Sequence, residues 1–410
     1  MLGHDHHIIW YDVKDKKELF IHAAIRYFGV WMIGIFLPAL LFKTYGLPLY
    51  IVFGFFGLTS AFIVPLNLLI SGKLVSRYWS KVSMTIWIIM LICFLLCFFW
   101  LGSWFNPTLL VLTAFFLWAF TAFFWMWYHY DMSGYAKSSH FGWKVANLNI
   151  IITISSSLAP LLAGLIIDNV GVEANLTIAI IIVAFSLFPL RHSYQRHKQQ
   201  TFKVKQIADM LHESAGIHSF ITFGALSYYK AVSMIIRPLV IFLFVWNYTK
   251  LWIISTATAI LTVTFIFIVG KYMDRNQDKK AVKTALFFES INRLTASLTL
   301  ALSLFSNIVI IWLDIVHRLS SKSTEAILSK KLYVYAHDNK INPVYMIIIH
   351  EVSHHIVKAI AMFWRAIVFF FFPYNRLLIA PIMLMLIAIP LQYSLFRNKK
   401  EIKHPLTNTL

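Results

Sequence analysis

The sequence has little charge for its length. Only 13% of its 410 residues are charged, against about 25% in an ordinary soluble protein, whereas 59% are hydrophobic and 17% are aromatic. A soluble domain cannot bury that much apolar surface. The composition therefore excludes a soluble globular protein and predicts a chain whose main solvent is lipid.

Cysteine and acidic residues are also scarce. The two cysteines, Cys93 and Cys97, lie one helical turn apart in one apolar segment, which is no disulfide framework. Asp and Glu number 17 against 36 Lys and Arg, a formal net charge of +19. Such a balance indicates nucleic-acid binding in a soluble protein. In a membrane protein it is typical of basic cytoplasmic flanks, so we expect no nucleic-acid partner.

Long apolar runs dominate the rest of the chain. About 20 residues rising 1.5 Å each are needed to cross a hydrocarbon core of about 30 Å as a helix. Twelve runs are candidates: 20–42, 50–70, 82–104, 107–128, 145–167, 174–190, 219–246, 252–270, 281–301, 303–316, 343–372 and 376–396. Of these, 174–190 and 303–316 are short, and 343–372 is longer than one span needs. The first run is too long for a cleaved signal peptide, so we expect it to stay as a helix.

The basic residues predict the orientation. With the N-terminus inside, 27 Lys and Arg fall on the inner side and 3 on the outer side. This bias predicts a multi-pass protein of the cell membrane with both termini in the cytoplasm.

A basic polar stretch divides the helices into six and six. We expect a cytoplasmic tail over 1–19, a bundle over 20–190, a linker over 191–218, a bundle over 219–396 and a tail over 397–410. In the linker, Ile207, Met210 and Leu211 recur at helical spacing, which predicts an interfacial helix drawn to anionic lipid. The alternative is a solvated linker.

A charged turn occurs twice, 198 residues apart. The second copy is the stronger and contains Gly270, Asp274, Arg275, Lys279 and Lys280. The first copy keeps Gly72 and Arg77 but has Ser76 in place of the aspartate. A turn repeated at about half the chain length predicts a duplicated bundle.

Twelve helices as six plus six, a long central loop and a G-x-x-x-D-R-x-x-x-K-K turn resemble the major facilitator superfamily of secondary transporters, over about residues 20–396. The resemblance implies an all-α membrane fold of two pseudo-symmetric six-helix bundles that moves a small solute by alternating access. It also implies that the charged turns clasp the two halves on the cytoplasmic side, with Asp274 as the main clasp because Ser76 departs from the pattern. No G-x-x-x-x-G-K-[ST] motif occurs, so we expect an ion gradient or the solute's own gradient as driving force.

Ionisable side chains within the helices are candidates for the transport path, because they are costly in lipid unless they face a cavity or a partner. In the superfamily, helices 1, 4, 7 and 10 line the cavity. The residues on these helices are His22, Arg26, Tyr128, Tyr229, Lys230, Arg237 and Asp314. Three cations among them favour a small anionic or polar solute; the alternative is that they snorkel to the interface. Proton coupling through His22, Glu289, Asp314 or Glu351 is left open.

One motif points to a different class of protein. The stretch from His350 through Glu351 to His354 reads H-E-x-x-H, which on a helix puts two histidines on one face for zinc and a glutamate for base catalysis. An intramembrane metalloprotease also needs a third ligand, and no aspartate follows Asp338. We therefore expect no enzyme, no cofactor and no metal site. Glu351 and Lys358 are instead expected to meet the Arg77 turn as part of the cytoplasmic gate.

The transporter is expected to be a monomer. A non-transporting relative with the same fold is the remaining alternative, and the charged path of helices 1 and 7 argues against it.

Overall fold

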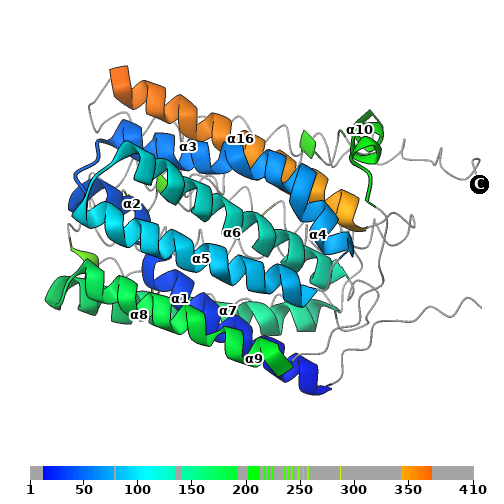
Figure 1. Ribbon diagram of the computed structural model, residues 1–410, viewed down its shortest axis with the longest axis horizontal. Coiled ribbons are helices and arrows are strands. Elements are labelled where there is room, and N and C mark those ends of the chain that lie inside the picture. The colour runs from blue at the N-terminus through cyan, green and yellow to red at the C-terminus, as the bar shows by residue number, and fades with distance from the viewer. Residues whose placement is uncertain are drawn as a thin grey trace, which may run out of the picture.

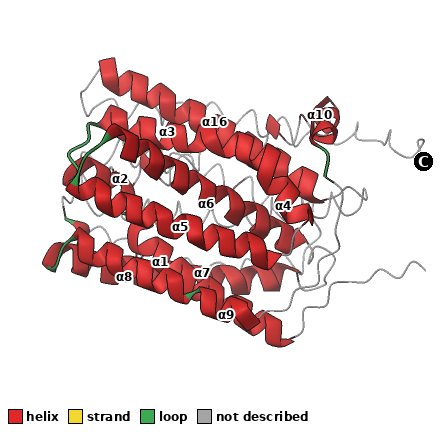
Figure 2. Ribbon diagram, viewed as in Figure 1, coloured by secondary structure: helices red, strands yellow, loops and turns green. Residues whose placement is uncertain are grey.

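The computed structural model describes residues 13–77, 80–133, 141–192, 202–212 and 343–371, together with single positions between 217 and 287. Every regular element in these ranges is a helix (Figure 2). In chain order they are α1 Val13–Gly34, α2 Leu37–Ala39, the π-helix η1 Leu40–Thr44, α3 Leu49–Leu66, the π-helix η2 Asn67–Ser71, α4 Gly72–Arg77, α5 Ser80–Ser103, α6 Pro107–Ser133, α7 Phe141–Asn169, α8 Val172–Phe185, α9 Leu187–His192, α10 Val204–His212 and α16 Pro343–Phe371.

Seven helical spans in the described part are long and apolar enough to cross a membrane: Ile21–Thr44, Leu49–Leu74, Met84–Ser103, Pro107–Tyr130, Ile150–Asn169, Val172–Pro189 and Val344–Phe371. They confirm seven of the twelve predicted spans, with ends that differ by a few residues. The remaining five predicted spans, 219–246, 252–270, 281–301, 303–316 and 376–396, lie mostly or wholly outside the described residues.

Bulky apolar side chains fill the interior between the helices. Phe36, Phe53 and Phe98 are fully buried in one continuous hydrophobic cluster that joins α1, α3, α5, α6 and α8. Side chains that face outward are also apolar, such as Trp100 and Leu162. Helices that are apolar on all sides fit a lipid environment, in which the packing of large side chains, rather than exclusion from water, holds neighbours together.

The first half of the chain meets the second half along α3 and α16, which lie side by side (Figure 1). The rings of Tyr50 and Phe370 are 5.4 Å apart, near the start of α3 and the end of α16. Midway, Phe363 lies directly against Gly57. The two helices therefore run antiparallel, and the start of α16 continues along η2 and α4.

The bundle has two ends, which we call the linker end and the opposite end. The linker end contains α4, α10 and the start of α16, whereas the opposite end contains the short loops after η1 and between α7 and α8 (Figure 1). The linker end is the one that the charge bias predicts to be cytoplasmic.

The apolar face of the linker helix α10 packs on α16. The attraction of the linker's basic residues to anionic lipid stays a prediction. Ile207 is buried against Val344, Ile347 and Ile348 at the start of α16. The residue before α10, Lys203, donates its backbone N–H to the Tyr345 hydroxyl at 3.0 Å. The apolar spacing was read correctly as a helix, but protein rather than lipid covers it.

Candidate metal site between the two halves

A carboxylate lies buried inside the bundle, where an unpaired charge is costly. Glu351 is in the third turn of α16 and only 2% of its surface is exposed. The groups around it must therefore neutralise or bind it.

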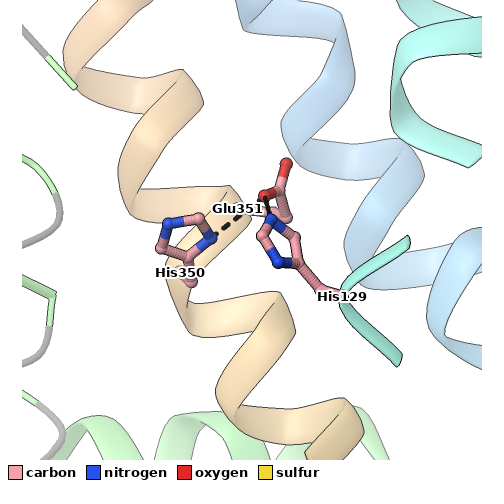
Figure 3. Close-up of side chains that lie close together, drawn as sticks. All are labelled: His129, His350 and Glu351. Carbon is pink, nitrogen blue, oxygen red and sulfur yellow. Dashed lines mark hydrogen bonds and ion pairs between the residues drawn. The ribbon is translucent and has the colours of Figure 1, made fainter. Parts of the chain in front are cut away.

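Three histidines surround this carboxylate (Figure 3 shows two of them). Glu351 Oε1 lies 3.0 Å from His350 Nδ1 and 3.3 Å from His129 Nε2. The other oxygen, Oε2, lies 3.5 Å from His355 Nε2. His350 and His355 share α16 with Glu351, whereas His129 comes from the last turns of α6 in the first half of the chain.

Aromatic packing holds the His129 ring in place. Trp125, one turn earlier on α6, stacks on it with ring centroids 5.6 Å apart. The His350 ring meets it edge to face at 4.9 Å. Both contacts fix the plane of the ring, so its Nε2 stays directed at Glu351.

The ligand atoms of His129, His350 and Glu351 all lie within 4.8 Å of one another, a spacing that can hold a metal ion. An ion with four tetrahedral bonds of about 2.1 Å places its ligands about 3.4 Å apart. The two shortest separations at Glu351 Oε1, 3.0 and 3.3 Å, are close to this value. Two imidazoles and a carboxylate form a donor set that suits zinc, iron and similar divalent ions.

No protein-family model matches the sequence, and no curated protein matches it. Solved structures do match. A crystal structure of a bacterial homologue of the iron transporter ferroportin in the outward-facing state has a TM-score of 0.66 at 11% identity, covering 93% of this chain and 98% of the other. The chain therefore shares the fold of this homologue over almost its whole length. The same homologue with soaked iron gives 0.64 at 13% identity, with 94% and 98% covered.

The two histidines of the H-E-x-x-H motif have different partners in the structure. The ring of His354 is 6.3 Å from that of His350, and its Nδ1 pairs with the Ser227 hydroxyl at 2.5 Å. The metal-capable group therefore takes His129 in place of His354. The solved structures with this fold are those of a transporter and not of an enzyme.

Two candidate path residues lie inside the first half. His22 Nδ1 bonds the Ser186 carbonyl at 2.7 Å, where the turn between α8 and α9 frees that oxygen. The Arg26 guanidinium lies 4.1 Å from the centroid of the Phe124 ring and 4.9 Å from that of Trp87. Arg26 is 2% exposed, so the alternative that it snorkels to the interface is wrong.

A third candidate, Tyr128, is half-buried beside the metal group. Its ring lies 5.3 Å from that of His129 and 5.5 Å from that of Trp125. It stays a candidate for the transport path.

The expected gate is described only in part. Gly72 lies against Phe202 and Ile348, so the first charged turn does contact α16. Glu351 faces His129, and Lys358 is half-buried on the same helix. Arg77 ends α4. The other expected path and gate residues lie outside the described residues: Tyr229, Lys230, Arg237, Asp314, Gly270, Asp274, Arg275 and Lys279.

The sequence analysis missed His129 and His355 as partners of Glu351. No spacing signal could have found His129, because it lies 221 positions before His350. His355 follows Glu351 by four residues, and this spacing alone predicts that the two side chains lie on one face of a helix.

Proposed function

We propose that this protein is a membrane transporter that carries a divalent transition-metal ion by alternating access. The observation that carries the proposal is the group of His129, His350 and Glu351, a metal-type donor set buried inside the bundle. The similar solved structures support the transporter fold, and one of them was soaked with iron. The soaked iron is a feature of the homologue's structure and not of this protein's.

The charge of the group favours a cation over the anionic solute expected from the sequence. Glu351 contributes one negative charge, and neutral imidazoles contribute none. Of the three cations that suggested an anion, only Arg26 is described, and aromatic rings cover its guanidinium. A divalent ion would more than neutralise the carboxylate, whereas an anion would add a second negative charge.

The placement of the ligands gives a route to release. His129 belongs to the first half, whereas His350 and Glu351 belong to the second. Rocking the halves apart at the linker end separates α6 from α16 and takes one imidazole from the ion. The ion then binds more weakly in the opened state, and this difference in affinity between two states is what alternating access requires.

Metal flux into proteoliposomes tests the proposal. Vesicles with an enclosed metal-sensitive dye are given Fe²⁺, Mn²⁺, Co²⁺ or Zn²⁺ in turn. We expect flux of at least one ion with the natural protein, and loss of most of that flux with His129→Ala or Glu351→Gln. His212→Ala, which removes an exposed histidine from α10, is the matched control and should transport normally. Equal flux with Glu351→Gln would refute the proposal.

A further inference from the structure

The second membrane helix is interrupted where it passes the metal group. Pro65 in α3 has no N–H to donate and its ring crowds the carbonyl one turn earlier. The π-helical turn η2 follows at Asn67–Ser71. A π turn inside an α-helix is frequently found at functional sites. Here η2 packs against both α6 and α16, the helices that carry His129 and Glu351.

Two polar side chains on this turn are buried without partners. Asn67 and Ser71 are both 0% exposed. Within the described part of the chain, neither Oδ1 nor Nδ2 of Asn67 has a hydrogen-bond partner, and neither has Ser71 Oγ. By contrast, the hydroxyls of Thr59 and Ser60, earlier on the same helix, bond carbonyls of their own helix. Unpaired buried polar groups destabilise a fold, so this pair points to a ligand.

The register between α3 and α16 gives the depth of the pair. Gly57 lies against Phe363 and Gly72 lies against Ile348. Each step forward along the chain from α3 to α4 therefore corresponds to one step back along α16. Asn67 is therefore level with Ser353, within the stretch of α16 that carries the metal group.

The neighbours of Asn67 on α3 and η2 agree with this register. Val64 and Leu68 pack against the cluster that contains Met126 of α6 and Val352 of α16. Those two residues lie one turn from His129 and next to Glu351, respectively. The buried amide and the metal group therefore occupy the same layer of the bundle.

We infer that Asn67 belongs to the metal site and that its side-chain oxygen is the fourth ligand of the ion. The inference rests on the proposed function. Two histidines and one glutamate leave one position of a four-coordinate ion open. An amide oxygen fills this position without adding charge, so the site keeps one negative charge. Ser71 lies one turn closer to the linker end and is the polar side chain that the ion contacts next as it leaves.

Binding of Co²⁺ to the purified full-length protein tests this assignment. Calorimetry gives the dissociation constant, and the visible d–d absorption reports the coordination of the ion. We expect Asn67→Ala to weaken Co²⁺ binding about tenfold, in line with losses of supporting groups at other metal sites, and to change the visible spectrum. Asn67→Asp, which keeps an oxygen there, should bind at least as tightly as the natural protein.

Thermal unfolding without metal separates a ligand from a structural residue. Asn67→Ala should unfold at the same temperature as the natural protein or higher, because it removes an unpaired buried amide. Asn175→Ala is the matched control: Asn175 is fully buried in α8, its Nδ2 donates to the Met32 carbonyl at 3.1 Å, and its loss should lower the unfolding temperature but not the Co²⁺ affinity.

The outcomes distinguish the two proposals. If Asn67→Ala binds Co²⁺ like the natural protein while Glu351→Gln does not bind, the metal site stands and the assignment of Asn67 is wrong. If the natural protein itself binds no Co²⁺, the metal-transport proposal fails. A lower unfolding temperature with unchanged affinity in Asn67→Ala would also overturn the assignment, because it marks a purely structural amide.

Discussion

At the scale of single residues, the side chains around a buried charge determine whether that charge can take part in binding an ion. Glu351 has three imidazoles around it, and nitrogen and oxygen donors of this kind bind metal ions. Arg26 lies over the faces of Tyr27, Trp87 and Phe124, which attract a cation. Metal-type donors therefore surround the buried charge of Glu351, whereas aromatic side chains surround the buried charge of Arg26.

Arg26 is accordingly predicted to stabilise the fold rather than to bind solute. Arg26→Ala should lower the free energy of unfolding by about 2–4 kcal/mol, because it leaves a cavity and removes the cation–π contacts. Metal affinity should stay within about twofold of the natural value. Thermal unfolding and Co²⁺ calorimetry check both parts, and a stable variant that no longer binds metal would contradict the packing role.

At the scale of helices, the described residues of the linker end approach one another closely at Gly72. A Cβ atom at Gly72 would lie 2.6 Å from Ile348 Cδ1 and 2.7 Å from Phe202 Cζ. Glycine is therefore needed to let α16 and the start of the linker lie on the turn after η2. Phe202 in turn stacks on Tyr345 with ring centroids 5.5 Å apart. The linker thus fastens both halves together at this end.

Gly72→Leu is predicted to loosen the linker end. The added side chain must displace Phe202 and Ile348, which should cost about 1–3 kcal/mol and free α10 from α16. Hydrogen exchange of α10 amides, followed by mass spectrometry, measures the release. Gly54→Leu in α3 is the control, because nothing lies within 4 Å of a Cβ there. Equal exchange in the two variants would show that Gly72 is not a contact point.

The helices also show what sequence can and cannot predict. The length of an apolar run predicts a span directly, since lipid thickness sets the requirement, and seven spans agree with the structure. Ile207, Met210 and Leu211 predicted a helix correctly but not its covering surface, because an apolar face looks the same against lipid and against α16. The metal group depends on His129 of α6 meeting α16, a tertiary contact that no local pattern contains.

At the scale of the whole molecule, the two halves touch at both ends of the bundle. At the opposite end, Thr44 Oγ1 and the Tyr248 hydroxyl are 2.9 Å apart. Burial raises the pKa of Tyr248 to about 12, so the phenol stays protonated at physiological pH. The Asp168 carboxylate accepts the backbone N–H of Thr249 at 2.9 Å and also its hydroxyl. Under the proposed function, these contacts and the linker-end contacts break in turn.

Asp168→Ala is predicted to favour opening at the opposite end. It removes both hydrogen bonds to Thr249 and leaves the linker end untouched. With Cys93 and Cys97 replaced by serine, a cysteine at Leu47, which is 4% exposed in the loop after η1, should react faster with a membrane-impermeant thiol reagent. Asn169→Ala is the control, because the Asn169 side chain bonds the Leu165 carbonyl of its own helix. An unchanged labelling rate in Asp168→Ala would show that this contact does not hold the opposite end.

The central claim is that one ion is held by both halves through His129, His350 and Glu351. X-ray absorption spectroscopy of the Co²⁺-loaded protein tests this most directly, because imidazole rings give a characteristic scattering pattern beyond the first shell. The account predicts two imidazoles per ion with oxygen completing the shell at about 2.0–2.2 Å, and one imidazole in His129→Ala. A shell of oxygen alone, or two imidazoles that persist in His129→Ala, would contradict it.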